Sequence, residues 1–173
     1  MEENKIMSPQ IKGVIIALTI IILGIAGYYS GLAFSGWYNW AVNAVMIIGL
    51  IIACVHFANQ KDGYVTFGKV FLHGFITSVV ITVIIVIYSV LAFTVLFPDM
   101  KEKMLEMQVE QMEKSGMDDD KIDQAKDATK RFFWVGVIGG GIFVTLIIGC
   151  IASLIGAAVA KKRKVNPMDQ FGT

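Results

Sequence analysis

The sequence predicts an all-α integral membrane protein, with four transmembrane helices in an antiparallel bundle and an extramembrane helical hairpin between the third and fourth. The first observation is composition: the 173 residues are 55% hydrophobic and 17% charged, whereas soluble domains have about 25% charged residues. The second is that Asp, Glu, Lys and Arg are absent from residues 13–34, 37–58, 70–97 and 132–160. Each run is long enough to cross a bilayer as a helix, and soluble core helices rarely stay apolar on every face for that long.

The positions of the spans follow from these runs. We expect them at about residues 11–34, 38–58, 68–97 and 131–160, with the hairpin at 98–131. The first run exceeds the about 7–15 apolar residues of a usual signal peptide, so we expect it to be retained. The turn "SGWYNW" between the first two spans is too short for anything but an antiparallel connection, and its aromatic rings suit the headgroup boundary.

Lysine and arginine beside the helix ends predict the orientation, because cytoplasmic loops carry an excess of these residues. The loop between the first two spans has none, and the opposite side has most of those that flank a helix. These are Lys5, Lys12, Lys61, Lys69, Lys161, Lys162, Arg163 and Lys164. The segment between the third and fourth spans also carries seven, but they are spread over a longer stretch. We therefore expect both termini in the cytoplasm.

The polar segment at residues 98–131 contains the start and stop signals of two helices. Pro98 suits a first helical position, and Gly116 suits the position just past a helix end. Asp118 suits the N-cap of a second helix. Because we expect both termini in the cytoplasm and three spans precede this segment, we expect the hairpin outside the cytoplasm.

The first arm of this hairpin has two apolar flanks. One is Met100, Met104 and Met107; the other is Leu105, Val109 and Met112. The expected inner stripe of the second arm is Ile122, Ala125, Thr129 and Phe132. The first arm thus offers more apolar surface than the second covers. Its methionines, Met100, Met104, Met107 and Met112, either fill an uneven hairpin interface or form a face for a partner or a second copy, since methionine suits adaptable surfaces.

Four residues near the cytoplasmic ends of the second and third spans are candidate functional residues. His56 and His73 could face each other as a proton or metal pair, or bond locally and reach headgroups. Between them, the loop that contains Tyr64 and Lys69 has the turn Asp62-Gly63. The loop is either a structured connector or, with His73, a docking or small-ligand site.

Small residues recur at the four-residue spacing that lets helix backbones approach each other. The candidate packing residues are Gly27, Gly31, Gly136, Gly140, Gly149, Ser153 and Gly156. They either pack the bundle within one chain or form contacts between copies.

The sequence contains no motif that indicates an enzyme, and we expect none. It has no metalloprotease, nucleophile-elbow, phosphate-loop or dinucleotide pattern. The run "DDDK" lacks the spacing of a calcium loop, and Cys54 and Cys150 lie in apolar runs as packing residues. We expect no metal and no cofactor. No basic surface with interleaved aromatics points to nucleic acid.

Three segments carry a resemblance to a known family. "GYVTFGKVFLHGF" follows the second span, "FPDMKEKMLEMQVEQMEKSGMDDDKIDQA" follows the third, and "IASLIGAAVAKKRK" closes the fourth. Together they resemble the bacterial inner-membrane proteins of domain-of-unknown-function family 4199, found mostly in Bacteroidota, over nearly the full length. The resemblance implies four spans and an uncharacterised role, and it supplies no catalytic residues.

Two functional hypotheses follow. The first is a structural or interaction protein, a scaffold or adaptor, that works in the lipid bilayer with a protein partner or as a homo-oligomer. The second is a small transporter or channel with a path near His56 and His73. The absence of acidic or basic residues at mid-depth of the expected spans argues against ion-coupled transport.

Overall fold

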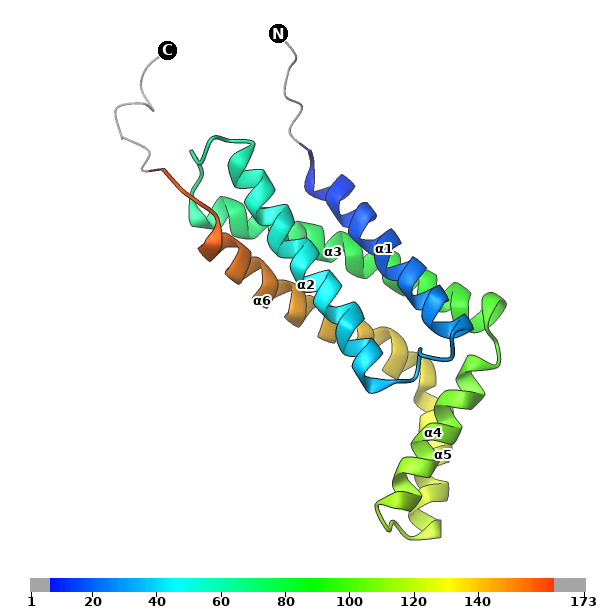
Figure 1. The fold of residues 1–173 in the computed structure, drawn as a ribbon. Helices are drawn as coiled ribbons and strands as arrows, with labels where there is room; N and C mark the ends of the chain where they lie inside the picture. Colours follow the sequence, from blue (N-terminus) through cyan, green and yellow to red (C-terminus); the bar gives the residue numbers. More distant parts are fainter. Residues whose placement is uncertain (1–6, 164–173) are drawn as a thin grey trace. The chain divides into compact units, whose positions relative to one another are not determined.

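The computed structural model describes residues 7–163, and all regular secondary structure in this range is helical (Figure 1). The elements, in chain order, are α1 (Pro9–Tyr29), α2 (Gly36–Asn59), α3 (Phe67–Leu91), η1 (Ala92–Leu96), α4 (Met100–Lys114), α5 (Asp119–Trp134), η2 (Val135–Gly140) and α6 (Gly141–Val159). The two η elements are π-helical. The basic residues Lys5 and Lys164 lie outside the described residues.

The prediction of four spans is confirmed, because four described helices are long and apolar enough to cross a membrane. They are Pro9–Tyr29, Gly36–Asn59, Phe67–Leu96 and Asp119–Val159. The first ends at Tyr29 rather than at residue 34, since Gly31 takes a left-handed conformation with φ of 73°. The last begins well before residue 131, because α5, η2 and α6 follow one another without a break.

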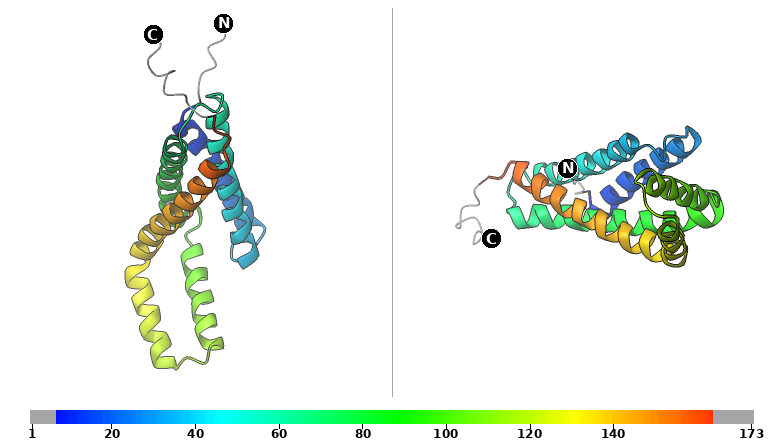
Figure 2. Two further views of the ribbon diagram at one scale, coloured as in Figure 1. Left: turned by 90° about the vertical axis from the view of Figure 1, so that its left-hand side faces the viewer. Right: turned by 90° about the horizontal axis from the view of Figure 1, so that it is seen from below.

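The chain divides into two compact units. The first contains α1, α2, most of α3 and most of α6, and the second consists of residues 85–144. In the first unit, α1 and α2 run side by side in opposite directions (Figures 1 and 2). The start of α1 contacts the end of α2 and the start of α3, since Lys12 bonds to both Ala53 and His73.

Small residues bring the helices of the first unit close together. A Cβ added to Gly156 of α6 would lie 2.7 Å from Cβ of Cys54 in α2. Gly149 of α6 packs on Ser78 of α3 in the same way, and Ser153 packs against Gly74. Without a hydrophobic driving force between helices in lipid, such close backbone approach supplies the dispersion energy that holds them together.

The remaining candidate glycines behave differently from one another. Gly27 of α1 is buried against the ring of Tyr38. Gly31 lies in the turn after α1, and among residues 7–163 a Cβ added at Gly31, Gly136 or Gly140 would meet nothing within 4 Å, so their role in helix packing stays a prediction. Four-residue spacing is a condition for packing, and only the face on which a residue falls decides whether a neighbour is there.

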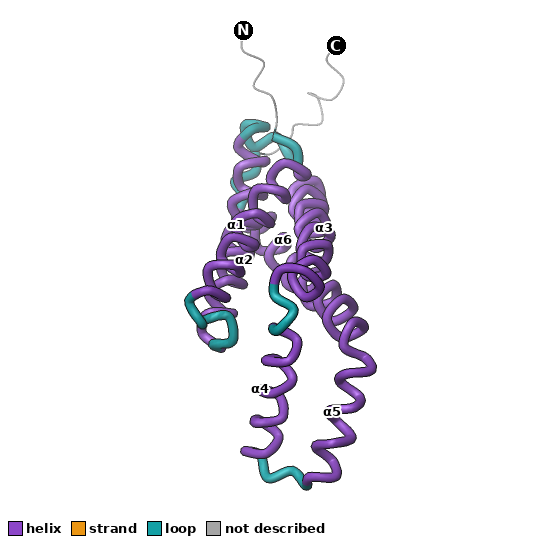
Figure 3. Tube along the Cα trace, turned by 90° about the vertical axis from the view of Figure 1, so that its right-hand side faces the viewer, coloured by secondary structure: helices purple, strands orange, loops and turns teal. Residues whose placement is uncertain are grey.

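The second unit holds α4 and α5 as two antiparallel arms (Figures 2 and 3). Gly116 takes φ of 73° at the turn, and Asp118 precedes α5 as its N-cap. Leu105 and Ile122 are buried between the arms. At the end of α4, Lys114 donates to Oε1 of Glu110 at 2.7 Å, and this hydrogen bond lowers the pKa of the Glu110 carboxyl.

One residue of the expected inner stripe is wrong. Phe132 is 59% exposed, and it is Phe133 that is buried, at 5%. Phe133 packs edge-on against Phe93, with ring centroids 5.3 Å apart, and Lys101 lies over the same ring. Phe133 follows Ile122 by eleven residues within α5, which is about three turns of 3.6 residues, so the regular helix places Phe133 rather than Phe132 on the face of Ile122.

The methionines of α4 divide between the two flanks. Met112 lies on the flank of Leu105 and is half-buried, as are Met100 and Met107. Met104 is exposed. The hairpin interior therefore lies along the Leu105 flank. Among the methionines of α4, Met104 is the one that α5 does not cover.

Candidate functional site

The most unusual group in the first unit is a buried lysine near the start of α1. Ser8 caps this helix by accepting a hydrogen bond from the amide of Ile11 at 3.4 Å, and Pro9 occupies its first turn. The helix therefore begins before Lys12 and carries it onto the inner face. The side chain of Lys12 is only 5% exposed. A lysine this buried is costly unless its charge is satisfied by hydrogen bonds.

Two hydrogen bonds satisfy Lys12. Its Nζ donates to the carbonyl oxygen of Ala53 at 3.1 Å and lies 3.2 Å from Nε2 of His73. A lysine ammonium has three donors and no acceptor. Toward an ammonium, Nε2 of His73 is the acceptor of this contact. The contact joins α1, α2 and α3 at one point.

Stacking holds the ring of His73 in place. Phe57 of α2 lies parallel to it, with centroids 4.1 Å apart and planes inclined by 11°. Lys12 Nζ is 5.9 Å from the centroid of the Phe57 ring. With Phe57 stacked on the ring, His73 is only 6% exposed. Its acceptor nitrogen is thus fixed toward Lys12 by its neighbours, which is the condition for a charge-assisted hydrogen bond of useful strength.

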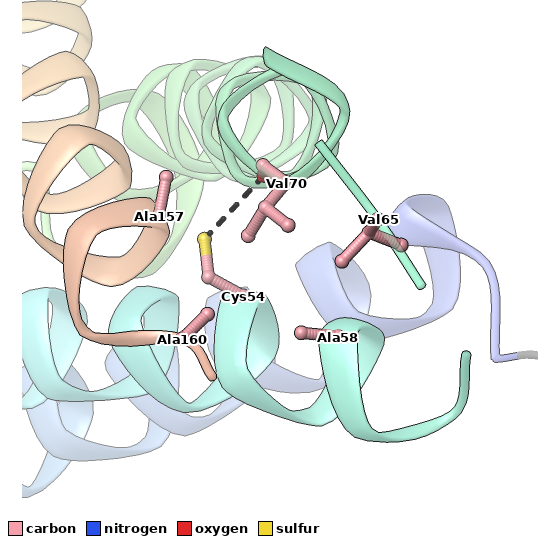
Figure 4. Packing of buried hydrophobic residues seen from close by; sticks show 6 residues of the cluster. All are labelled: Cys54, Ala58, Val65, Val70, Ala157 and Ala160. Atoms are coloured by element: carbon pink, nitrogen blue, oxygen red, sulfur yellow. Dashed lines mark hydrogen bonds between the residues drawn. The ribbon is translucent and has the colours of Figure 1, made fainter. Parts of the chain in front are cut away.

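A cluster of small apolar residues packs α2, α3 and α6 next to this contact (Figure 4). Its members are Cys54, Ala58, Val65, Val70, Ala157 and Ala160. The thiol of Cys54 points toward the carbonyl oxygen of Val70, at 3.8 Å (Figure 4). Cys54 and Cys150 are both free thiols. Cys54 follows Ala53, so the lysine's backbone acceptor and this apolar cluster occupy the same turn of α2.

The sequence suggested His56 and His73 as a facing pair; the direct partners of the His73 ring among residues 7–163 are Lys12 and Phe57. His56 is exposed at the end of α2, whereas His73 is buried and bonded to Lys12. Consecutive residues of a helix point about 100° apart, and here Phe57 rather than His56 covers the His73 ring. Among residues 7–163, no group of three His, Cys, Asp or Glu side chains could hold a metal ion.

The other two candidates differ from His73 in exposure, although Lys69 lies one helical turn before it in α3. Tyr64 and Lys69 are exposed, and Tyr64 contacts Arg163, whose guanidinium carbon lies 5.8 Å from the ring centroid. The amide of Lys69 donates to Oγ1 of Thr66 at 3.4 Å. A docking or small-ligand site built on Tyr64, Lys69 and His73 stays a prediction.

Lys12 was not predicted from the sequence to be a site residue. It stands one position before the first apolar run and was counted only as a charge that orients the chain. The signal that could have found it is the cap: Ser8-Pro9 starts the helix a full turn before the run begins. The residue that follows Lys12 is Gly13, which packs closely on Val80 and Thr77, so this part of α1 lies against α3.

Comparison with known proteins gives one match. A family model with the description "Protein of unknown function (DUF4199)" matches residues 12–162. No curated protein and no solved structure matches the chain. The matched region contains both Lys12 and His73, as well as α4 and α5.

Proposed function

We propose a function on the premise that this chain belongs to the DUF4199 family, a family of unknown function, as its sequence resemblance predicted. The protein is a multi-pass membrane protein, and we assign it a non-enzymatic, structural role as a scaffold or adaptor. Its location is the inner membrane of a bacterium, with both termini in the cytoplasm. The basic residues beside the helix ends and the uncharged first turn support this orientation.

The observation that carries the scaffold proposal is the use of buried polar groups in the first unit. A transporter needs polar atoms that converge on a path and remain available to a substrate. Here Thr77, Thr82 and Ser153 donate to carbonyl oxygens of their own helices at 2.6–2.8 Å. Within residues 7–163, Oε1 of Gln60 is the one buried side-chain polar atom without a partner. The interior is therefore occupied by packing and leaves little for a substrate.

The hairpin supports a role in interaction. Its arms carry many charged side chains on their outer faces, and Met104 stays open on α4. A segment of this kind is compatible with water and offers a surface that another protein can bind. We place it outside the cytoplasm, since it lies between the third and fourth spans.

A second candidate is a small transporter or channel with a path near His56 and His73. One observation favours it: Lys12 and His73 are a titratable pair buried between three helices. Groups of this type within membrane helices often take part in proton or ion movement. In that case the pair would change its hydrogen bonds during each cycle.

Reconstitution separates the two candidates. Purified protein in liposomes should conduct no ion and take up no metabolite above empty liposomes if the scaffold proposal is right. Crosslinking in native membranes should then capture a specific protein or a second copy through the hairpin. A flux that is lost in His73→Ala but kept in His56→Ala would favour a path through the Lys12 contact and would reject the scaffold proposal.

A further inference from the structure

The end of α6 is tied to the loop between α2 and α3. The amide of Arg163 donates to the carbonyl oxygen of Gly63 at 2.9 Å. Gly63 is buried with φ of 79°, and a Cβ there would lie 3.3 Å from the carbonyl oxygen of Lys161. Only glycine suits this conformation and this closeness. The three basic residues after α6 are thereby held against the loop over part of their backbone.

Aromatic rings of the loop lie under two of these basic side chains. Nζ of Lys162 is 5.4 Å from the ring centroid of Phe67, and Cζ of Arg163 is 5.8 Å from that of Tyr64. Both rings are partly open to the surroundings, at 43% and 53% exposed. A cation over a ring face is held by the quadrupole of the ring, while its N–H groups on the other side remain free to donate.

The charge of this region is strongly positive. Its members, which we call the basic platform, are Lys61, Tyr64, Phe67, Lys69, Lys161, Lys162 and Arg163. The only carboxylate in the loop is Asp62. Each ion pair found among residues 7–163 lies in the hairpin, as in Lys103–Asp99, Lys114–Glu110 and Lys121–Asp118. Three hairpin cations thus pair with carboxylates, and none of these ion pairs among residues 7–163 involves a cation of the platform.

The platform lies at the ends of apolar helices. Phe67 is the first residue of α3, and Lys161 comes two positions after Val159, the last residue of α6. Both helices belong to candidate spans. Residues at such positions lie at the depth of the lipid headgroups, where phosphodiester groups are concentrated and aromatic and basic side chains are favoured.

We propose that the basic platform binds the headgroup of an anionic phospholipid. Arg163 and Lys162 donate to the phosphate oxygens, Lys61 and Lys69 add charge from the loop and from α3, and the rings of Tyr64 and Phe67 pack against the glycerol and upper acyl region. We assign the site to a lipid rather than to free phosphate, because its aromatic members supply apolar contacts that an inorganic ion cannot use. It adds a lipid specificity that the scaffold role does not require.

The test compares lipids on the full-length protein in detergent. Native mass spectrometry counts bound phosphatidylglycerol against phosphatidylcholine, and the wild type should prefer the anionic lipid by about tenfold or more at low salt. The variant Lys161→Gln, Lys162→Gln, Arg163→Gln should lose most of this preference. The matched control, Lys121→Gln, Lys126→Gln, Lys130→Gln, removes three exposed hairpin cations and should keep it. Equal losses in both variants would overturn the proposal.

A second variant controls for the possibility that the first one misfolds at the end of α6. Lys61→Gln with Lys69→Gln changes two exposed side chains, and it should lower the preference by about threefold or more while leaving the helical circular dichroism unchanged. Unchanged preference in this variant would overturn the role of the loop. Inorganic phosphate provides the last arm: if it displaces the lipid at low millimolar concentration, the site binds phosphate and the lipid assignment is wrong.

Discussion

Nζ of Lys12 lies 3.2 Å from Nε2 of His73, although 61 positions separate the two residues in the chain. The same nitrogen reaches the carbonyl oxygen of Ala53 at 3.1 Å. One side chain therefore fixes the register of α1 against both α2 and α3. In an interior made mostly of aliphatic side chains, a directional contact of this kind selects one arrangement among several that would bury similar area.

Replacing Lys12 by methionine should destabilise the bundle. The apolar stem is kept, but His73 Nε2 loses its donor, and a buried acceptor without a partner costs about 1–3 kcal/mol. Thermal or steric-trap unfolding in bicelles measures this loss. Lys69→Met is the control, because Lys69 is exposed and its change should cost less than about 0.5 kcal/mol. Equal stability of Lys12→Met and wild type would mean that the contact contributes nothing.

Replacing His73 should distinguish acceptor chemistry from ring packing. Gln keeps an acceptor that can reach Lys12, so His73→Gln should retain more stability than His73→Phe, which keeps the ring against Phe57 and removes the acceptor. In the background of Lys12→Met, the His73→Phe loss should shrink by about 1 kcal/mol or more, since the two residues form one contact. Strict additivity of the two losses would contradict the hydrogen bond.

Gly156 should tolerate no larger side chain. A Cβ there would lie 2.7 Å from Cβ and 2.9 Å from Sγ of Cys54, so Gly156→Leu must push α2 and α6 apart. Overpacking of this type costs about 1–3 kcal/mol. Gly24→Leu serves as the control, because nothing lies within 4 Å of a Cβ added at that position. If both variants unfold at the wild-type temperature, α6 does not pack on α2 at this point.

Impermeant maleimide labelling tests the orientation. A cysteine at Asp119 should react in intact cells, because we place the hairpin outside the cytoplasm, and a cysteine at Lys61 should not. Lys61 is a better position than Gly63, whose left-handed backbone and buried site would strain a cysteine. Lysed cells should label both positions. The reverse pattern in intact cells would reverse the orientation, and labelling at both would contradict four spans.

The two flanks of α4 should respond differently to substitution. Leu105 is buried against α5, so Leu105→Ala should loosen the hairpin by about 2 kcal/mol or more and speed its proteolysis. Met104 is exposed, so Met104→Glu should leave the rate of proteolysis unchanged and weaken any crosslink made through the open face. The double variant Met104→Glu, Met107→Glu should do so more strongly. Crosslinks that survive the double variant would exclude the methionine face as a docking surface.

Much of the fold could be predicted because it depends on composition. A run of uncharged residues long enough to cross a bilayer predicts a span regardless of its neighbours, and Gly116 with Asp118 marks the turn and the second helix start by local chemistry alone. The contact of Phe133 with Phe93 could not be predicted in this way, because it joins residues that are far apart in the chain.

The candidate site depends on contacts between distant residues, and this is why it was missed. His73 could be chosen from the sequence as a polar residue in an apolar run, but its partner could not. Nothing in the residues near position 12 indicates that α1 begins beside the start of α3. Likewise Gly149 and Ser153 have the same four-residue spacing as Gly136 and Gly140, and only the neighbouring helix distinguishes the two pairs.

The separation of Lys12 from its acceptors has a consequence for biogenesis. The ribosome completes α1 before it has made Ala53 or His73, which lie 41 and 61 positions further along. During that interval neither native partner of the ammonium exists, so we expect the start of α1 to reach its final position only after the third span is made. The contact would thereby make the placement of the first helix depend on the third.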